Sequence, residues 1–262
     1  MLYLLSPAKT LDYDTPVPAP LQRKATEPLF GPQAAGLIEV MRRQSAAQVA
    51  ELMGLSEKLA ALNVARYAAW QLKATPVNGK PAVLAFAGDV YDGLQAASLK
   101  TADFTWAQQH LVILSGLYGA LRPLDLLQPY RLEMGTALKT AAAKDLYGYW
   151  GDTVAEHLNT LQADESAPVV VNLASQEYAR VALRPRLRAR VVECVFEELR
   201  QADGGEPRII SFFAKKARGL MARYAVQHRV RSVKALQAFD AAGYAYERRA
   251  SSADRLVFRR AS

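Results

Sequence analysis

The chain has 262 residues, 51% of them hydrophobic, which is enough for one large domain with a sizeable core. Its single cysteine, Cys194, lies in an apolar run, so it is expected to be buried. One cysteine excludes a disulfide framework and a cysteine-rich metal site, and it favours a reducing compartment. No apolar run approaches the roughly 18 residues of a membrane span, and the first residues lack the pattern of a secretion signal, so a soluble, cytoplasmic protein is expected.

The charge is unevenly distributed along the chain. Residues 179–262 carry 19 Lys and Arg against 8 Asp and Glu, a net charge of +11, whereas the first 178 residues have a net charge of −3. A basic C-terminal third favours a polyanionic partner, most simply nucleic acid. The alternative is that these charges serve only solubility.

The N-terminal segment predicts a short buried strand followed by an extended arm. Residues 2–5 are apolar and run into Ser-Pro-Ala-Lys-Thr, so Lys9 is expected near a cleft at the strand end. Five of the 13 prolines lie within residues 12–32, which predicts a non-helical arm wrapped on the body. Helical periodicity begins near Gln33 and continues in a second helix over residues 46–53.

Residues 46–70 resemble the helix-hairpin-helix motif of DNA-repair proteins, in which a short turn presents backbone N–H groups to a phosphate. Gly54 matches the first glycine of that motif, and Lys58 a common basic position, whereas Ser56 replaces the second glycine. Helix N-termini attract anions because their first N–H groups have no intrahelical partner. The alternative is that Ser56 only caps the following helix.

The middle of the chain predicts two buried strands that end in polar loops. Residues 81–86 read as a strand that leads to Asp89, and residues 111–115 read as a strand after a helix over 101–109. The loop that follows carries Arg122 and Arg131 beside prolines, with Asp125 and Glu133 close by. Such a loop suits either recognition of a phosphate or carboxylate, or a rigid turn whose arginines pair with those two acids.

The C-terminal part predicts a basic helix that directly follows a strand. Lys215, Arg218 and Arg223 fall near one face of a helix over residues 212–224. We also expect His157 to be a surface histidine within a helix over 145–161. The remaining expected elements are a buried strand over 169–173, strands over 191–196 and 209–213 joined as a hairpin by the turn at 203–205, a short helix over 233–239, and a terminal hairpin of 244–247 with 256–259.

Strands that alternate with helices predict an α/β fold, and no repeat or inter-domain linker divides residues 1–262. We therefore expect a single domain with a central mixed sheet flanked by helices. Five separated motifs, in this order, are similar to the YaaA family of bacterial peroxide-stress proteins. They are SPAKT at 6–10, FAGDVYDGL at 86–94, SGLYGALRPLDLLQPYRLEMG at 115–135, NLASQEY at 172–178 and FFAKKARGLMARY at 212–224.

The resemblance implies a cytoplasmic, monomeric protein that limits the damage done by intracellular iron during oxidative stress. It also implies an unusual topology, a helix-hairpin-helix element beside a basic cleft, and DNA binding, but no established reaction. One cysteine and three scattered histidines provide no recognisable metal-ligand cluster, so no metal or other cofactor is predicted. Direct iron binding by carboxylates such as Asp89, Asp92, Asp125 and Glu133 is a weaker alternative.

The first functional hypothesis is a protein that binds double-stranded or distorted DNA, largely without sequence preference. Cations around a cleft at the strand ends would neutralise phosphates, and the 54–58 turn would add backbone N–H contacts. The residues predicted to bind nucleic acid are Lys9, Gly54, Ser56, Lys58, Arg66, Arg122, Arg131, Lys215, Lys216, Arg218 and Arg223.

The second hypothesis is an enzyme that excises or modifies bases in nucleic acid or nucleotides at the same cleft. An acid beside arginines can activate water or stabilise a developing cation. The catalytic candidates, all after predicted strands, are Asp125, Asn172, Glu133, Asp89 and Glu177. A third hypothesis is a stress protein that only binds a partner.

Overall fold

A computed structural model describes residues 1–199 and 205–261. Its centre is a mixed sheet to which these residues contribute eight strands. The order is β11 (Ala245–Tyr246), β12 (Arg255–Ala261), β9 (Arg190–Leu199), β8 (Val169–Asn172), β1 (Leu2–Leu5), β5 (Leu111–Ser115) and β6 (Gly119–Leu121), with β10 (Pro207–Arg208) paired to β9. Five of these strands run parallel to one another, and three pair antiparallel: β11 and β6 at the two edges, and β10 with the end of β9.

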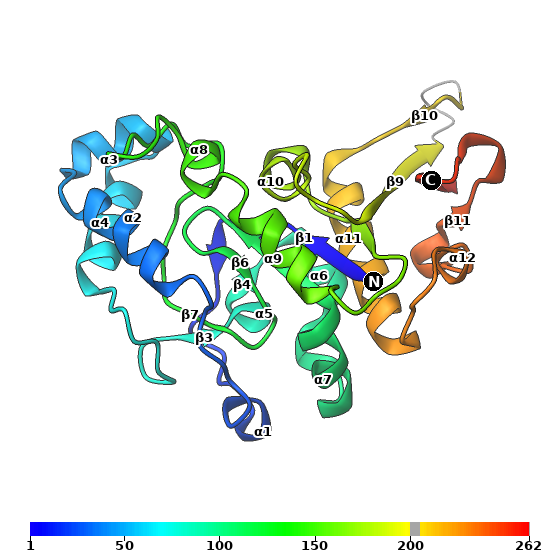
Figure 1. Ribbon diagram of the computed structural model, residues 1–262, viewed down its shortest axis with the longest axis horizontal. Coiled ribbons are helices and arrows are strands. Elements are labelled where there is room, and N and C mark those ends of the chain that lie inside the picture. The colour runs from blue at the N-terminus through cyan, green and yellow to red at the C-terminus, as the bar shows by residue number, and fades with distance from the viewer. Residues whose placement is uncertain (200–204, 262) are drawn as a thin grey trace.

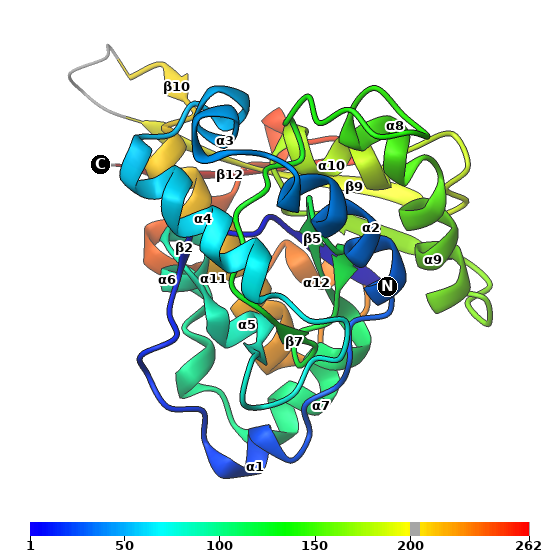
Figure 2. The same cartoon turned by 90° about the vertical axis from the view of Figure 1, so that its left-hand side faces the viewer.

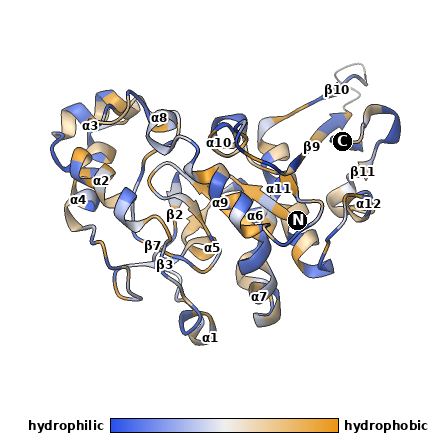
Figure 3. Ribbon diagram, viewed as in Figure 1, coloured by the Kyte–Doolittle hydropathy of each residue, from blue (hydrophilic) through white to orange (hydrophobic). Residues whose placement is uncertain are grey.

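The central strands are the most deeply buried part of the molecule. Every residue of β1 and β5 is buried, and the middle of Figure 3 is correspondingly the most hydrophobic in colour. Strands β1, β5, β8, β9 and β12 run parallel. The apolar runs of β1, β5 and β8 are typical of a parallel sheet, which is covered on both faces. Their carboxyl ends therefore meet at one edge of the sheet.

The helices form three groups around this sheet (Figures 1 and 2). In the first, α7 (Thr101–His110) and α11 (Ser211–His228) pack against each other and against β1. The second group comprises α8 (Leu146–Trp150), α9 (Thr153–Leu161) and α10 (Gln176–Ala182): α10 contacts α8 and α9 and packs on β5, and α9 packs on β6. In the third, α2 (Gly31–Arg42), α3 (Ala46–Met53) and α4 (Glu57–Ala69) lie together at one end of the molecule.

Shorter elements complete the chain, and none of the helices is long and apolar enough to cross a membrane within the part that the structure describes. The short elements are α1 (Ala19–Gln22), α5 (Ala82–Ala85), α6 (Asp89–Leu94), α12 (Val233–Leu236), β2 (Thr10–Leu11), β3 (Lys80–Pro81), β4 (Phe86–Ala87), β7 (Leu126–Leu127), and the 3-10 turns η1 (Ala96–Ser98), η3 (Ala241–Gly243) and η4 (Arg248–Ala250).

The strongly periodic segments form the elements that the sequence predicts. Strands β1, β5 and β8, helices α3 and α7, and the terminal hairpin of β11 with β12 are confirmed. The predicted short helix at 233–239 is confirmed over its first turn and ends at Leu236. Cys194 is buried in β9, and burial raises the pKa of its thiol to about 12.

The prediction of one strand over residues 81–86 is wrong. A helical turn, α5, separates β3, which pairs with β7, from β4, which pairs with β2. Ala82, Val83 and Ala85 of this turn are buried. A short apolar run that is buried on all sides shows no alternation of polar and apolar residues, so its sequence does not distinguish a strand from a helix.

The hairpin predicted from residues 191–196 and 209–213 has the predicted pairing but different bounds. Strand β9 extends to Leu199, and its antiparallel partner is the two-residue β10, with Pro207 opposite Leu199. Residues 209–213 are not a strand, because α11 begins at Ser211 and is longer than the predicted helix. Asp203 and Gly204 of the predicted turn lie outside the described residues.

Two further predictions have wrong helix boundaries, and the differences lie at glycine and proline residues. The single helix expected over 145–161 is divided into α8 and α9 at Gly151, which has a φ of +48°. The arm at 12–32 contains α1, and α2 begins at Gly31 instead of Gln33. Proline lies in the first turn of both helices, where its missing N–H group has no intrahelical partner to lose.

The N-terminal arm is tied to the body at both ends. Thr26 pairs with Asp125 through its backbone and donates its hydroxyl to the Asp125 carboxylate at 2.6 Å. Lys80 is buried and donates to the carbonyl of Thr15 at 2.9 Å, with the Asp12 carboxylate 3.3 Å away. Backbone donation from Thr15, supported by Lys80, lowers the pKa of Asp12 to about 2.

His157, which the sequence predicts to be a surface residue, is half-buried. Its ring lies 5.5 Å from that of Phe30 in an edge-to-face contact, and burial lowers its pKa. Burial likewise lowers the pKa of His110, whose Nδ1 lies 2.9 Å from the carbonyl of Met1.

These two histidines predict loss of stability in mild acid. A histidine whose folded-state pKa is depressed binds a proton more readily in the unfolded chain, so the free energy of unfolding should fall as pH decreases through about 6.5. Urea unfolding between pH values of about 7.5 and 5.5 measures this slope. The double variant His110→Gln/His157→Gln should flatten it, and an unchanged slope would contradict the assignment.

Candidate functional site

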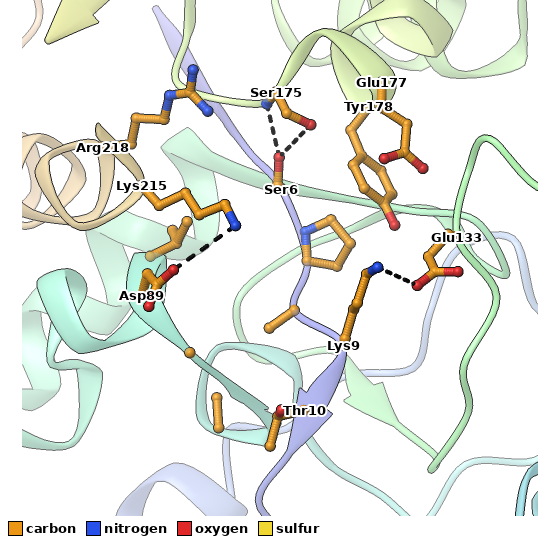
Figure 4. A pocket seen from close by; sticks show the side chains of 15 residues that line it. Ser6, Lys9, Thr10, Asp89, Glu133, Ser175, Glu177, Tyr178, Lys215 and Arg218 are labelled. Carbon is orange, nitrogen blue, oxygen red and sulfur yellow. Dashed lines mark hydrogen bonds and ion pairs between the residues drawn. The ribbon is translucent and has the colours of Figure 1, made fainter. Parts of the chain in front are cut away.

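A pocket of about 510 Å³ lies where the carboxyl ends of β1 and β8 meet (Figure 4). Open α/β sheets place ligand sites at this edge because adjacent strand exits leave a crevice there. Five segments that are distant in sequence form its wall. They are residues 6–10 after β1, residues 87–90 before and at the start of α6, Glu133, residues 175–178 at the start of α10, and one face of α11.

Two serines join the strand exits on which the pocket is built. The Ser6 Oγ accepts a hydrogen bond from the backbone N–H of Ser175 at 2.8 Å, and the two hydroxyls are 3.3 Å apart. The Tyr91 hydroxyl donates to the carbonyl of Ser6 at 3.0 Å, which ties α6 to the same point. The exits of β1 and β8 are therefore held in fixed relation.

The charged groups of the pocket form a cationic rim over acidic walls. Lys9 Nζ lies 3.0 Å from Glu133 Oε1, and Lys215 Nζ lies 3.9 Å from Asp89 Oδ2. The lysine side chains are 69% and 52% exposed, whereas their carboxylate partners are only 17% and 28% exposed. An approaching anion therefore meets ammonium groups first, and the carboxylates lie deeper.

Arg218 adds a third cation from α11, one turn beyond Lys215 (Figure 4). Burial lowers the pKa of its guanidinium, an effect that the negative charge of Glu193 opposes. Tyr178, also in the wall, is buried, and its pKa is raised by that burial. The pocket thus combines three cations, an aromatic side chain and carboxylates.

Glu177 and Arg131 hold the loop that closes one side of the pocket. Glu177 Oε1 accepts a hydrogen bond from the backbone N–H of Gly135 at 2.9 Å. Arg131 Nη2 lies 3.1 Å from Glu133 Oε1, so Arg131 and Lys9 share one carboxylate. Arg131 contacts the pocket only through this shared partner.

The α3–α4 hairpin borders the pocket on another side. Gly54 ends α3 with a φ of +61° in the left-handed region, and the Ser56 hydroxyl caps α4 by accepting from the Leu59 N–H. Lys58 in the first turn of α4 is exposed. A smaller hollow of about 270 Å³ connects the hairpin to the pocket, because it is lined by Leu52 and Met53 of α3 together with Lys9, Glu133 and Glu177.

Several predicted site residues lie elsewhere and serve the fold. Arg122 is paired with Asp125, which is 1% exposed, at 2.9 Å, and this clasp holds the N-terminal arm. Asn172 caps the turn after β8 by accepting from the Ala174 N–H at 3.0 Å. Arg223 donates to the carbonyls of Leu94 and Gln95 at the end of α6.

Arg66 lies on α4 and lines a different, mostly apolar hollow with Trp70 and Pro129. Lys216 is exposed on α11, beside Lys215 but not in the pocket wall. The structure thus gathers Lys9, Asp89, Glu133, Glu177, Lys215 and Arg218 in one pocket.

The sequence-based selection missed Ser6, Ser175 and Tyr178. Each follows a strand that the sequence identified as buried, so position after a parallel strand was the available signal. Neither serine stands out by residue type, because Ser is common in any loop. The two serines meet only because β1 pairs with β8, and these strands are too far apart in the chain for the sequence to reveal the pairing.

The fold and the site define a class of protein: a single-domain α/β protein with a charged pocket at the carboxyl edge of a mixed sheet. Residues 1–250 match the family described as peroxide stress protein YaaA, and the chain belongs to that family. Its relatives include UPF0246 proteins of Leptothrix cholodnii, 64% identical over 99% of this chain and 98% of the relative, and of Bordetella avium, 59% identical over 99% of both. A UPF0246 protein of Variovorax paradoxus is also 59% identical over 99% of both chains.

Proposed function

We propose that this peroxide-stress family member binds DNA, largely without sequence preference, and so protects it from iron-dependent oxidative damage. The cationic rim of the pocket would hold phosphates, and the α3–α4 hairpin would dock beside it. The protein would act as a cytoplasmic monomer and would need no cofactor for this role.

The convergence of three cations on one pocket, the exposed Lys9 and Lys215 and the half-buried Arg218, is the observation that carries the proposal. Lys9 comes from the exit of β1, whereas Lys215 and Arg218 come from α11, more than 200 residues later, yet all three reach one pocket. Sequence-independent binding to DNA depends on cations that replace the counterions of phosphates. The net charge of +11 in residues 179–262 would add a long-range attraction.

The hairpin supports the same function by its position. The exposed Gly54, Ser56 and Lys58 follow in the chain directly after Leu52 and Met53, which line the hollow that joins α3 to the pocket. Lys58 adds a cation on the first turn of α4, near N–H groups that helices leave unpaired. A duplex that spans the pocket rim and this turn would contact both.

Binding of labelled DNA over a range of salt concentrations tests the proposal. We expect duplexes of unrelated sequence to bind with similar affinity, and log K to fall with log salt with a slope of about −4.5 to −5.5, which corresponds to five or six phosphate contacts. A slope close to zero, or strong preference for one sequence, would overturn it.

The second candidate function is an enzyme acting on bases in nucleic acid. Asp89, Glu133 and Glu177 gather in the pocket wall, which favours this candidate, whereas Asp125 and Asn172 are committed to loop caps. A carboxylate beside a cation is suited to activating water. Recovered DNA should therefore be examined for strand breaks and, after alkali treatment, for lost bases; altered DNA would favour the enzyme, and intact DNA the binding protein.

A further inference from the structure

Phe212 is the only exposed phenylalanine, tyrosine or tryptophan in the part of the chain that the structure describes. It lies in the first turn of α11 and is 55% exposed. The other phenylalanines and the tryptophans, within the same residues, are buried or half-buried. The role of this side chain is not explained by the core or by the pocket.

The ring of Phe212 is supported from behind. It contacts the ring of Phe213 edge-to-face at 5.5 Å, and the guanidinium of Arg260 lies over the Phe213 ring at 4.6 Å. Arg260 is in turn paired with the buried Glu198 at 2.9 Å. Phe213, Arg260 and Glu198 therefore restrict the motion of the Phe212 ring, which lowers the conformational entropy lost when a flat ligand stacks on it.

Cations flank this ring on the same side of the helix. Lys215 and Lys216 follow it by three and four residues, which places one on each side of Phe212 about one turn further along. Both lysines are exposed, and Lys215 also reaches the pocket rim. Phe212 thus lies one helical turn before two exposed lysines, the first of which lines the pocket.

We propose that Phe212 is a stacking platform for an unpaired nucleobase, with the adjoining phosphates held by Lys215 and Lys216. The inference rests on the proposed DNA-binding function and specifies its substrate class as DNA with unpaired bases. An aromatic face beside a cationic track is how proteins bind single strands without reading sequence, since every base has a face that can stack. In an intact duplex the bases are already stacked, so the ring gains no partner.

Substitution of Phe212 separates stacking from charge. Phe212→Ala should weaken binding of a single-stranded oligonucleotide about 5- to 150-fold, the range typical of one lost base stack, and change binding of the matching duplex less than about 3-fold. The salt dependence should keep its slope, because no cation is removed. Phe212→Leu should behave like alanine, and Phe212→Trp should retain affinity and show quenching of its new fluorescence by the single strand.

Ile209→Ala is the matched control, because Ile209 is a neighbouring apolar side chain that is 59% exposed and not aromatic. It should leave single-strand binding unchanged. Equal losses from Ile209→Ala and Phe212→Ala would identify an apolar contact surface for a protein and overturn the stacking role. Unchanged single-strand affinity in Phe212→Ala would also overturn it while leaving DNA binding intact, whereas failure of wild type to bind either strand form at low salt would refute the proposed function itself.

Discussion

Gly219→Ala is expected to destabilise the protein by about 3 kcal/mol or more, despite the better helix propensity of alanine. Gly219 lies in α11 where it crosses α6, and an added Cβ would come within 1.8 Å of the Val90 carbonyl oxygen and 2.8 Å of the Leu94 nitrogen. On the α6 side, a Cβ added at Gly93 would come within 2.1 Å of the Lys216 carbonyl oxygen on α11. Backbone atoms cannot rotate away, so the helices must separate.

Gly36→Ala is the matched control for this substitution. Gly36 also lies inside a helix, α2, but its added Cβ would meet only the Tyr149 hydroxyl at 2.9 Å, at the end of a flexible side chain. Its effect should lie within about 1 kcal/mol, because the propensity gain of about 1 kcal/mol offsets a small side-chain shift. Urea unfolding of both variants measures the difference, and equal effects would show that the crossing tolerates separation.

Separation of α6 and α11 would also disturb the pocket. Asp89 begins α6, and Lys215 and Arg218 lie on α11, so the crossing at Gly219 sets the distance between these charged groups. A folded fraction of Gly219→Ala is therefore expected to bind DNA more weakly than wild type even where its circular dichroism is unchanged. The two glycines position the site without contacting any ligand.

The triple variant Lys9→Ala/Lys215→Ala/Arg218→Ala is expected to lose most of its DNA affinity. It removes the three cations of the pocket wall, and each lost phosphate contact should make the salt slope less negative by about 1. The affinity at about 100 mM salt should fall on the order of 100-fold. Fluorescence anisotropy with a labelled duplex measures both quantities.

A charge-matched control distinguishes the pocket from overall charge. Arg184, Arg186 and Arg190 are paired with surface carboxylates outside the pocket, so their alanine substitution removes the same net charge. This control should change the slope by less than about 1. Equal losses in the two triple variants would mean that diffuse positive charge, and not the pocket, binds DNA.

Local sequence patterns predicted the elements whose signal is short-range. The apolar runs of β1, β5 and β8 identified buried strands, and the Gly54 turn with Ser56 identified a helical hairpin. The strand predictions over 81–86 and 209–213 were wrong, because β-type residues there do not lie in a strand of the sheet. Ile209 and Phe212 suit a strand by residue type, yet both are exposed, Ile209 just before α11 and Phe212 in its first turn.

The site divides in the same way between local and long-range information. The sequence alone indicated Lys9, Asp89, Glu133, Glu177, Lys215 and Arg218, because each follows a strand or lies on a basic helix. It also selected Arg122 and Asp125, which only the tertiary structure assigns to the N-terminal arm, through a hydrogen bond from Thr26 to Asp125 across 99 residues of chain.

The sequence by itself therefore determined the α/β class, the family and the basic C-terminal third, since these depend on residue type and local period. The tertiary structure decided which charges meet. Strand order brings β8 beside β1, and the contact of Gly93 and Gly219 lays α11 across α6. Both are packing relations between segments far apart in the chain, and no local pattern encodes which distant partner a buried strand or a small-residue helix face will contact.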